Sequence, residues 1–149
     1  MTTSEAKAAR IREAGADEVI VAERAGDFSG EVRRLTGGQG VDVTIDNVGS
    51  PVFESVRRSM ADDGRIVLVG QVTGDFISIN PAQLFLRNVS IISAKGVSRA
   101  QLADALELVA RRRIRPVVED VCRLEDAAEA HRRVEAGRSS GRLVLSPVK

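Results

Sequence analysis

Short apolar, β-branched segments alternate with helix-like segments along almost the whole chain, and this alternation restricts the fold more than any other feature of the sequence. Strands are expected over residues 18–22, 41–46, 65–70, 89–94, 116–119 and 142–145. Helices are expected over residues 2–14, 27–36, 50–60, 81–86, 98–113 and 125–136. Such alternation predicts an α/β fold, with a mostly parallel sheet and flanking helices. The middle strands are continuously apolar, which is typical of strands covered on both faces.

Capping and breaking residues set the expected element boundaries. Ser50 followed by Pro51 is expected to cap the third helix, and Ser98 has Gln101 at the capping-box position. Thr2 or Thr3 is expected to cap the first helix. Gly64 is expected to separate the third helix from the strand that follows it.

Composition excludes several classes of protein. The chain has 149 residues, 43% hydrophobic and 29% charged, with a formal net charge of +1, which is typical of a globular domain without a polyanionic partner. We therefore expect no nucleic-acid binding. The longest apolar runs are too short for a membrane span, and the first residues lack the apolar core of a signal peptide. The single cysteine, Cys122, excludes an internal disulfide and suits a reducing cytoplasm.

Small or glycine residues follow three of the expected central strands. In parallel α/β sheets, ligands bind beyond the carboxyl ends of the strands. This rule selects three turns, at residues 46–49, 70–74 and 93–96. A flat ligand could lie against the backbone there.

These turns, together with four longer stretches, resemble the medium-chain dehydrogenase/reductase family, which contains the zinc-type alcohol dehydrogenases and quinone oxidoreductases. The four stretches are Ser4 to Ala9 with Glu13 to Ile20, Gly40 to Gly49, Asp63 to Gly70, and Ala130-His131 with Gly141 to Leu145. They occur in the family's order and at its spacing. No single stretch is specific, but the match covers the whole chain.

The resemblance implies a partial Rossmann fold. Residues 1–113 would be an incomplete dinucleotide-binding domain in which the first strand and its glycine loop are missing. Residues 114–149 would be the tail that completes the catalytic domain. The implied function is hydride transfer to or from a small carbonyl, alcohol or quinone, with NAD(P)H as cofactor. We expect this chain alone to bind cofactor weakly and to turn over nothing. The alternative is a non-catalytic Rossmann-like module that acts through assembly.

The residues at the start of the chain bear on the choice of cofactor. The resemblance implies that Ser4 and Lys7 approach the adenosine ribose or its 2′-phosphate. The family's ribose-binding acid falls at Thr2, and the loss of that carboxylate beside Lys7 and Arg10 favours NADPH over NADH. The alternative is a solvated helix face.

The nicotinamide side is expected at the strand-end turns. The candidate residues are Asn47, Val48, Val69, Gly70, Gln71, Ser93 and Lys95. The alternative is ordinary connecting turns. The glycine-rich segment at residues 37–40 follows a helix and precedes a strand, the reverse of a phosphate-binding loop, so we interpret it as a plain connection.

No catalytic residue and no metal ligand is predicted in this chain. His131 lies in the middle of a helix beside two arginines and is interpreted as structural or solvent-facing. Cys122 has no zinc-ligand spacing to His131 and is interpreted as a small buried apolar residue.

A homo-oligomer, most simply a dimer, is predicted on two grounds. In the Rossmann order, two strands should separate residues 19–22 from residues 41–46. Without them, the first segment lies beside the second, is left alone, or another chain fills the gap. The resemblance also places the segment at residues 89–94 at an edge that the family uses for dimers.

Overall fold

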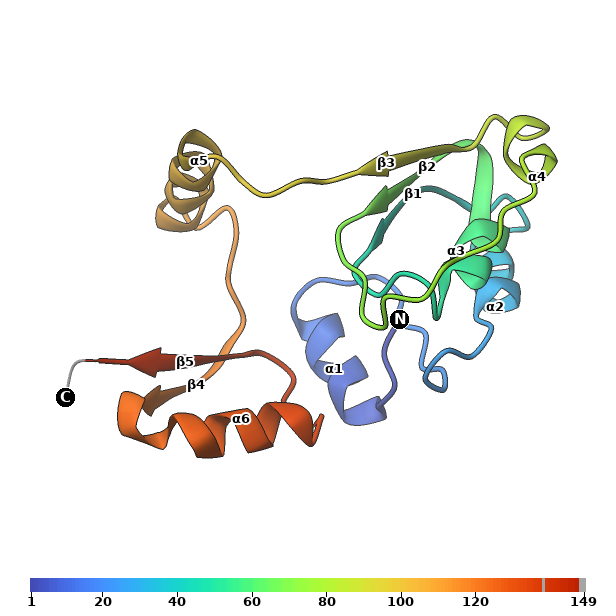
Figure 1. The fold of residues 1–149 in the computed structure, drawn as a ribbon. Coiled ribbons are helices and arrows are strands. Elements are labelled where there is room, and N and C mark those ends of the chain that lie inside the picture. The colour runs from blue at the N-terminus through green and yellow to red at the C-terminus, as the bar shows by residue number, and fades with distance from the viewer. Residues whose placement is uncertain (138, 148–149) are drawn as a thin grey trace. The chain divides into compact units, whose positions relative to one another are not determined.

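The computed structural model describes residues 1–137 and 139–147. They form two compact units, Met1–Gly96 and Val97–Lys149. Unit 1 contains α1 (Glu5–Glu13), α2 (Ser29–Leu35), β1 (Val41–Asp46), α3 (Phe53–Ser59), β2 (Met60–Leu68), α4 (Ala82–Phe85) and β3 (Ser90–Ser93) (Figure 1). Unit 2 contains α5 (Arg99–Ala110), β4 (Val118–Arg123), a 3-10 turn (Leu124–Asp126), α6 (Ala127–Glu135) and β5 (Arg142–Ser146).

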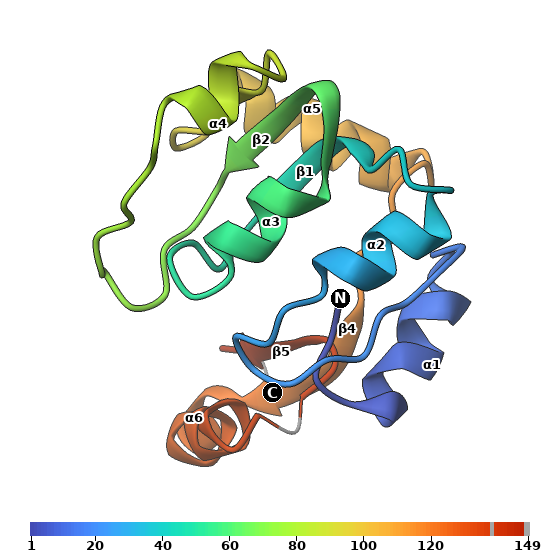
Figure 2. The same ribbon diagram turned by 90° about the vertical axis from the view of Figure 1, so that its right-hand side faces the viewer.

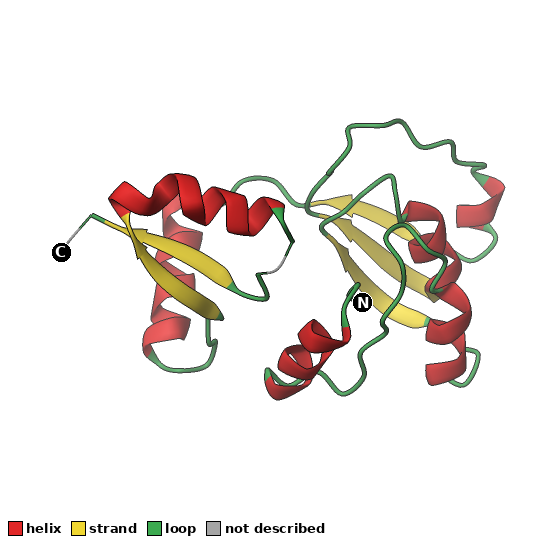
Figure 3. Ribbon diagram, turned by 90° about the horizontal axis from the view of Figure 1, so that it is seen from below, coloured by secondary structure: helices red, strands yellow, loops and turns green. Residues whose placement is uncertain are grey.

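Unit 1 is built on a three-stranded parallel sheet in the order β1-β2-β3. The strands lie side by side, and helices α2 and α3 lie on one side of them (Figures 2 and 3). Parallel strands joined through helices confirm the predicted α/β fold with flanking helices. The carboxyl ends of all three strands meet at one edge of the sheet, because the strands run in the same direction.

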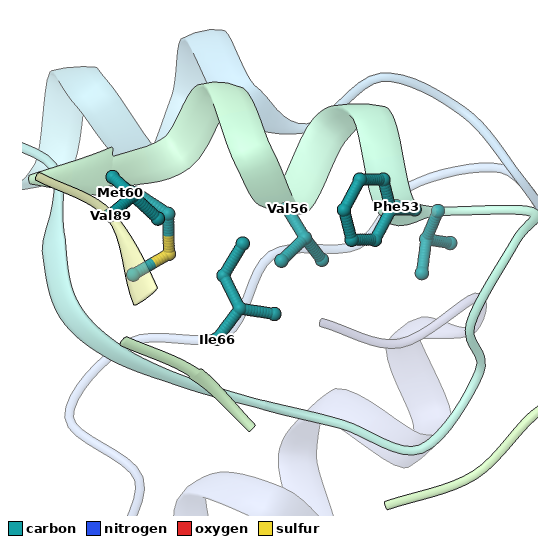
Figure 4. Packing of buried hydrophobic residues seen from close by; sticks show 6 residues of the cluster. Phe53, Val56, Met60, Ile66 and Val89 are labelled. Atoms are coloured by element: carbon teal, nitrogen blue, oxygen red, sulfur yellow. The ribbon is translucent and has the colours of Figure 1, made fainter. Parts of the chain in front are cut away.

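The core of unit 1 lies between α3 and the sheet. Its fully buried side chains are those of Met60 and Ile66, each 0% exposed. Phe53 and Val56 project from α3 towards Ile66, and Met60 lies at the far end of the cluster beside Val89 (Figure 4). This burial stabilises the packing of the short helix α3, which at seven residues is too short to be stable alone.

The opposite face of the same sheet is open within unit 1. Val43 is 50% exposed, Ile45 67% and Ile92 45%. The prediction that the central strands are covered on both faces is therefore wrong for unit 1, because the residues of this unit supply a cover for one face only.

The predicted strand at residues 18–22 does not form. Its contact with another extended segment is a single parallel bridge between Val21 and Thr2. Thr2 N donates to Ile20 O at 2.8 Å, and Ala22 N donates to Thr2 O at 3.0 Å. Residues 18–22 fail as a strand because one neighbouring residue provides too few hydrogen bonds for a ladder. Three arrangements were predicted for this segment: beside β1, left alone, or paired through another chain. Pairing with β1 is excluded, because the described strand neighbour of β1 is β2.

Two predicted boundaries around the third helix are also wrong. The helix was expected to begin at Ser50, but α3 begins at Phe53 and its cap residue, Val52, makes no side-chain cap bond. Gly64 was expected to precede the next strand, but β2 starts at Met60 and runs through it. A Cβ on Gly64 would lie 2.7 Å from Met60 Cε, so this glycine allows the chain to pack closely on itself.

Other local predictions are confirmed. β1 occupies Val41–Asp46 as predicted. Ser98 and Gln101 form the expected capping box at the start of α5. The first helix does form, but its cap position is Ser4 rather than Thr2 or Thr3, and Ser4 makes no side-chain cap bond.

Unit 2 consists of a two-stranded parallel sheet, β4-β5, with α6 packed beside it. Ala130 is the buried residue of α6, and Arg133 Nη1 of the same helix donates to Asp120 Oδ2 at 2.7 Å. The two compact units meet at residues 96 and 97, whereas the expected domain division lies at residues 113 and 114. The expected division concerns the domains of a longer enzyme, so it stays a prediction.

The two residues that the sequence set aside as non-catalytic lie in unit 2. His131 is exposed, in agreement with its interpretation as solvent-facing. Cys122 is only partly buried, and its Sγ lies 3.8 Å from both Asp120 Oδ2 and Arg133 Nη1. Its interpretation as a buried apolar residue is therefore wrong, since its neighbours are a charged pair.

Candidate functional site

The two turns that leave β1 and β2 are joined by backbone hydrogen bonds. Val69 N and Gly70 N donate to Asp46 O at 2.8 and 3.2 Å, and Val72 N donates to Val48 O at 2.9 Å. A Cβ on Gly70 would lie 2.7 Å from Asn47 O, so the backbones approach more closely than any other residue type allows there. These bonds place the predicted residues of both turns next to one another.

The Asp46 side chain shapes the first turn. It is 3% exposed, and its Oδ1 accepts hydrogen bonds from Val48 N at 2.8 Å and Gly49 N at 3.0 Å. An aspartate that binds the backbone N–H groups two and three residues later holds a turn in place of a backbone acceptor. Gly49 completes the turn with a φ of +81°, which favours glycine.

The Gln71 side chain ties the second turn to the first. Its Oε1 accepts from Ser50 N at 3.0 Å, and its Nε2 donates to Ser50 Oγ and, at 3.0 Å, to Asp75 O. Ser50 Oγ in turn donates to Asp75 O. The amide of Gln71 is therefore used within the protein, which leaves its backbone and methylene groups to face a ligand.

A cavity of about 320 Å³ lies between these two turns. It is lined by Gly49, Ser50, Phe53, Leu68, Val69, Gly70, Gln71 and Ile77. The lining is apolar side chains and exposed backbone, with few polar groups. An apolar lining with a few polar groups that fix orientation is typical of small-molecule binding sites.

The structure brings together some of the predicted site residues and separates others. Val69, Gly70 and Gln71 line this cavity, whereas Asn47 and Val48 line a second one on the other side of the β1 turn. Ser93 ends β3, and Lys95 follows it, with both residues exposed. Ser4 and Lys7 lie at the start of α1.

Sequence reasoning missed the residues that hold the turns. Asp46 and Ser50 act through hydrogen bonds, and Phe53, Leu68 and Ile77 supply apolar lining. The Asp-Asn-Val-Gly sequence after a strand was a usable signal, because aspartate three residues before glycine is typical of a side-chain-stabilised turn. The part played by Ser50 carried no such signal, because its partners are 21 and 25 residues away.

The glycine-rich segment at residues 37–40 is a connection between α2 and β1, as predicted. Gly37, Gly38 and Gly40 all have positive φ, and a Cβ on Gly40 would lie 2.5 Å from Ser59 O. These glycines satisfy the geometry of a helix end rather than a phosphate.

A third cavity, of about 370 Å³, lies near α1 and has an acidic lining. It includes Glu5, Asp27 and Glu31. Hydrogen bonds from the Ser29 side chain and backbone lower the pKa of Asp27 to about 2, and a hydrogen bond from Arg34 lowers the pKa of Glu31. Both carboxylates are therefore ionised at neutral pH, and they oppose a phosphate in this cavity.

No group of three or more His, Cys, Asp or Glu side chains suited to a metal ion occurs in residues 1–137 and 139–147. Within the same residues, no helix is both long enough and apolar enough to cross a membrane.

The fold and the strand-end turns define an α/β protein of the dinucleotide-binding type, and comparison with known proteins gives the family. Residues 14–145 match the family model described as zinc-binding dehydrogenase. The chain therefore belongs to the zinc-binding dehydrogenase family, in agreement with the resemblance found in the sequence.

Individual relatives agree with this assignment. The chain is 34% identical over 152 aligned residues to quinone oxidoreductase-like protein 2 of Bos taurus, covering 96% of this chain and 43% of the relative. Other relatives that match over most of the chain are named acryloyl-coenzyme A reductase, in Metallosphaera sedula, and NAD-dependent alcohol dehydrogenase, in Sulfolobus acidocaldarius.

Solved structures show the same similarity in three dimensions. The crystal structure of AibC superposes with a TM-score of 0.87 at 42% identity, over 99% of this chain and 41% of that one. A mycobacterial protein, Rv1454c, solved in complex with NADPH, superposes with a TM-score of 0.76 at 31% identity, over 98% of this chain and 49% of that one. The chain thus spans less than half the length of these relatives.

Proposed function

We propose that this chain supplies the nicotinamide-side part of an NADPH-dependent oxidoreductase that transfers hydride to or from a small carbonyl, alcohol or quinone. The observation that carries the proposal is the cavity of about 320 Å³ at the carboxyl ends of β1 and β2. Ligands of parallel α/β sheets bind at this edge. The family and the NADPH complex of a structural neighbour support the choice of cofactor class.

The residues present fit a nicotinamide ring. Val69, Leu68 and Phe53 offer an apolar surface, and Gly70 brings backbone close to the cavity without a side chain. The Gln71–Ser50 hydrogen bonds hold the two walls at a fixed separation. When bound, the cofactor supplies the hydride chemistry, while this chain positions the ring and excludes water from one side of it.

The preference for NADPH rests on charge at the start of the chain. Lys7 and Arg10 on α1 attract a 2′-phosphate, and Thr2 replaces a ribose-binding acid. The acidic cavity of Glu5, Asp27 and Glu31 acts in the opposite direction. The proposal is that the two cations of α1 outweigh these acids at the 2′-phosphate.

A competition between the two cofactors tests the proposal. NADPH and NADH are titrated separately into the purified chain, with binding followed by the fluorescence of the reduced nicotinamide. We expect weak binding, tighter for NADPH, and no turnover. Lys7→Ala should reduce the preference about tenfold, the effect of one charge-assisted contact, whereas Arg12→Ala on the same helix should not. Tighter binding of NADH, or rapid NADPH oxidation by the chain alone, would overturn it.

The second candidate function is a non-catalytic module that acts through assembly. The open sheet face, with Val43 and Ile45 exposed, favours it, because large exposed apolar surfaces mark interaction sites. Both proposals include two further expectations. These are a homodimer through the Ser90–Ser93 edge and a cytoplasmic location. Sedimentation velocity at increasing concentration tests the dimer, and a monomer at every concentration would contradict it.

A further inference from the structure

The cavity at the carboxyl ends of β1 and β2 has a third wall, which comes from the segment at residues 73–79. Ile77 of this segment lines the cavity together with Phe53 and Leu68. The segment contains no helix or strand, and its residues up to Ser78 are exposed. No hydrogen-bonded element therefore fixes its position, and the contacts that hold the segment also decide whether Ile77 closes the cavity.

One backbone group, Asp75 O, carries the hydrogen bonds that join this segment to the rest of unit 1. It accepts from Ser50 Oγ and, at 3.0 Å, from Gln71 Nε2. Among the described residues, the N–H groups of residues 73–79 make one hydrogen bond, from Asp75 N to Thr73 Oγ1 at 3.4 Å, and it lies within the segment. We call residues 73–79 the lid, and the two contacts at Asp75 O the latch.

The two donors of the latch hold each other in place. Gln71 Oε1 accepts from Ser50 N at 3.0 Å, and Gln71 Nε2 also donates to Ser50 Oγ. A serine hydroxyl has one proton to donate, and Ser50 uses it on Asp75 O. Removal of this hydroxyl therefore breaks half of the latch and leaves the apolar lining of the cavity unchanged.

The lid remains anchored at both ends when the latch opens. On one side, Val72 N donates to Val48 O at 2.9 Å, and on the other, Ile79 packs against the core of unit 1. Between these anchors, Ile77 is 38% exposed and Phe76 is 103% exposed. Release at Asp75 O thus frees the part of the lid that carries Ile77, without unfolding the sheet or α3.

We propose that the lid gates the cavity: the latch at Asp75 O holds Ile77 against a bound ring, and its release lets the ring enter and leave. Ser50 is a positioning residue that acts through Asp75 O, and Ile77 is the side chain that closes the cavity. The identity of the ring, a nicotinamide, rests on the proposed function, whereas the latch is present without a ligand. Lids of this kind separate a site from water and can limit the rate of ligand release.

Digestion with chymotrypsin tests the latch without cofactor, with the cut after Phe76 followed by mass spectrometry. A protease cuts a segment only when several residues detach together, so the rate reports release of the lid. Ser50→Ala should raise this rate about fivefold, the effect of one hydrogen bond, and Ser50→Thr, which keeps the hydroxyl, should restore it. Ser78→Ala is the matched control on the lid and should be cut like the wild type.

Stopped-flow mixing with NADPH tests the gate, with binding followed by the fluorescence of the reduced nicotinamide. Ser50→Ala should raise both the association and the dissociation rates about fivefold, because an open latch speeds entry as well as exit. Ile77→Ala should also raise both rates, but it should be cut by chymotrypsin like the wild type, since its latch is intact. Ser50→Thr and Ser78→Ala should keep the wild-type rates.

Two results would overturn the gate. Equal chymotrypsin rates for the wild type and Ser50→Ala would show that Asp75 O does not hold the lid. Faster dissociation from Ser50→Ala with an unchanged association rate would assign Ser50 a contact with the ring instead of a latch. Failure of the proposed function has a different signature: the wild type would not bind NADPH, while Ser50→Ala would still be cut faster and the latch would stand.

Discussion

The two faces of the unit 1 sheet are built from similar residues but have opposite environments. On one face, Ile66 lies under α3 and is 0% exposed, and on the other, Ile45 is 67% exposed. Both are isoleucines near the carboxyl ends of adjacent strands, at neighbouring register positions. The difference arises from the helices, because α2 and α3 both lie on the first face (Figure 2).

The two isoleucines show that the sequence of a strand does not specify which of its faces is covered. In β1, Val43 and Ile45 point to the same face of the sheet, and unit 1 leaves that face open. The two turns that form the candidate site at the strand ends are nevertheless in place, because the residues that hold them do not need the open face to be covered.

Truncating one isoleucine on each face of the sheet should give the largest difference in stability. Ile66→Ala should lower the free energy of unfolding by about 2–5 kcal/mol, because it leaves a cavity in the packed core. Ile45→Ala should lower it by less than about 1 kcal/mol, because that side chain is already largely in water. Urea unfolding of the two variants and the wild type measures both. Equal losses would show that Ile45 is buried in solution.

A second pair of substitutions sharpens the link between the covered face and the site. Gly49 and Gly74 have φ values of +81° and +77°, but a Cβ on Gly49 would lie 2.3 Å from Gln71 Oε1, whereas one on Gly74 meets nothing within 4 Å. Gly74→Ala should cost about 1 kcal/mol from backbone strain alone. Gly49→Ala should cost about 1–2 kcal/mol more, because it also displaces Gln71.

Cofactor titration of the same pair provides the functional measurement. Gly49→Ala should weaken NADPH binding, and Gly74→Ala should not, because Gly49 lines the cavity and Gly74 does not. Similar unfolding midpoints for the two variants would contradict the proposed contact between Gly49 and Gln71.

The smallest expected effect is the loss of folding stability at acid pH when Asp27 becomes protonated. Asp27 Oδ1 accepts from Ser29 N, Ser29 Oγ and Ser55 Oγ, which joins the segment before α2 to α3 on the covered face. These hydrogen bonds lower the pKa of Asp27 from 3.8 to about 2. The folded state therefore favours the ionised form, and its contribution is fully present above pH 3.8 and is lost as pH falls towards 2.

Asp27→Asn should flatten this part of the pH profile. The measurement is the thermal midpoint between pH 5 and pH 2 for the wild type, for Asp27→Asn and for the control Asp17→Asn. The wild type and the control should lose stability more steeply than Asp27→Asn below about pH 4. Parallel curves for all three proteins would exclude a role of Asp27 in joining α2 to α3.

Much of the fold could be predicted from the sequence, because its strongest signals are local. The β-branched run of β1 and the Ser98–Gln101 capping box both act within a few residues, and both were predicted correctly. Residues 18–22 have equally strong strand propensity but lack a ladder partner. Strand formation there depends on a neighbour that local sequence does not describe.

The site could be predicted to the level of its turns but not of its contacts. The rule that ligands bind at strand carboxyl ends selected Val69, Gly70 and Gln71, which do line one cavity. The use of the Gln71 amide by Ser50 depends on the close approach of two turns 21 residues apart, which no local pattern shows.

Mapping NADPH on the chain through backbone amide chemical shifts tests the proposed nicotinamide site most directly. The predicted result is that the largest changes fall at Val69, Gly70 and Gln71, with smaller ones at Ser93 and Lys95 and at the start of α1. Removing the 2′-phosphate, by using NADH, should erase the changes at α1 and keep those at Val69 to Gln71. Changes confined to unit 2, or no changes up to the solubility limit of the cofactor, would contradict the account.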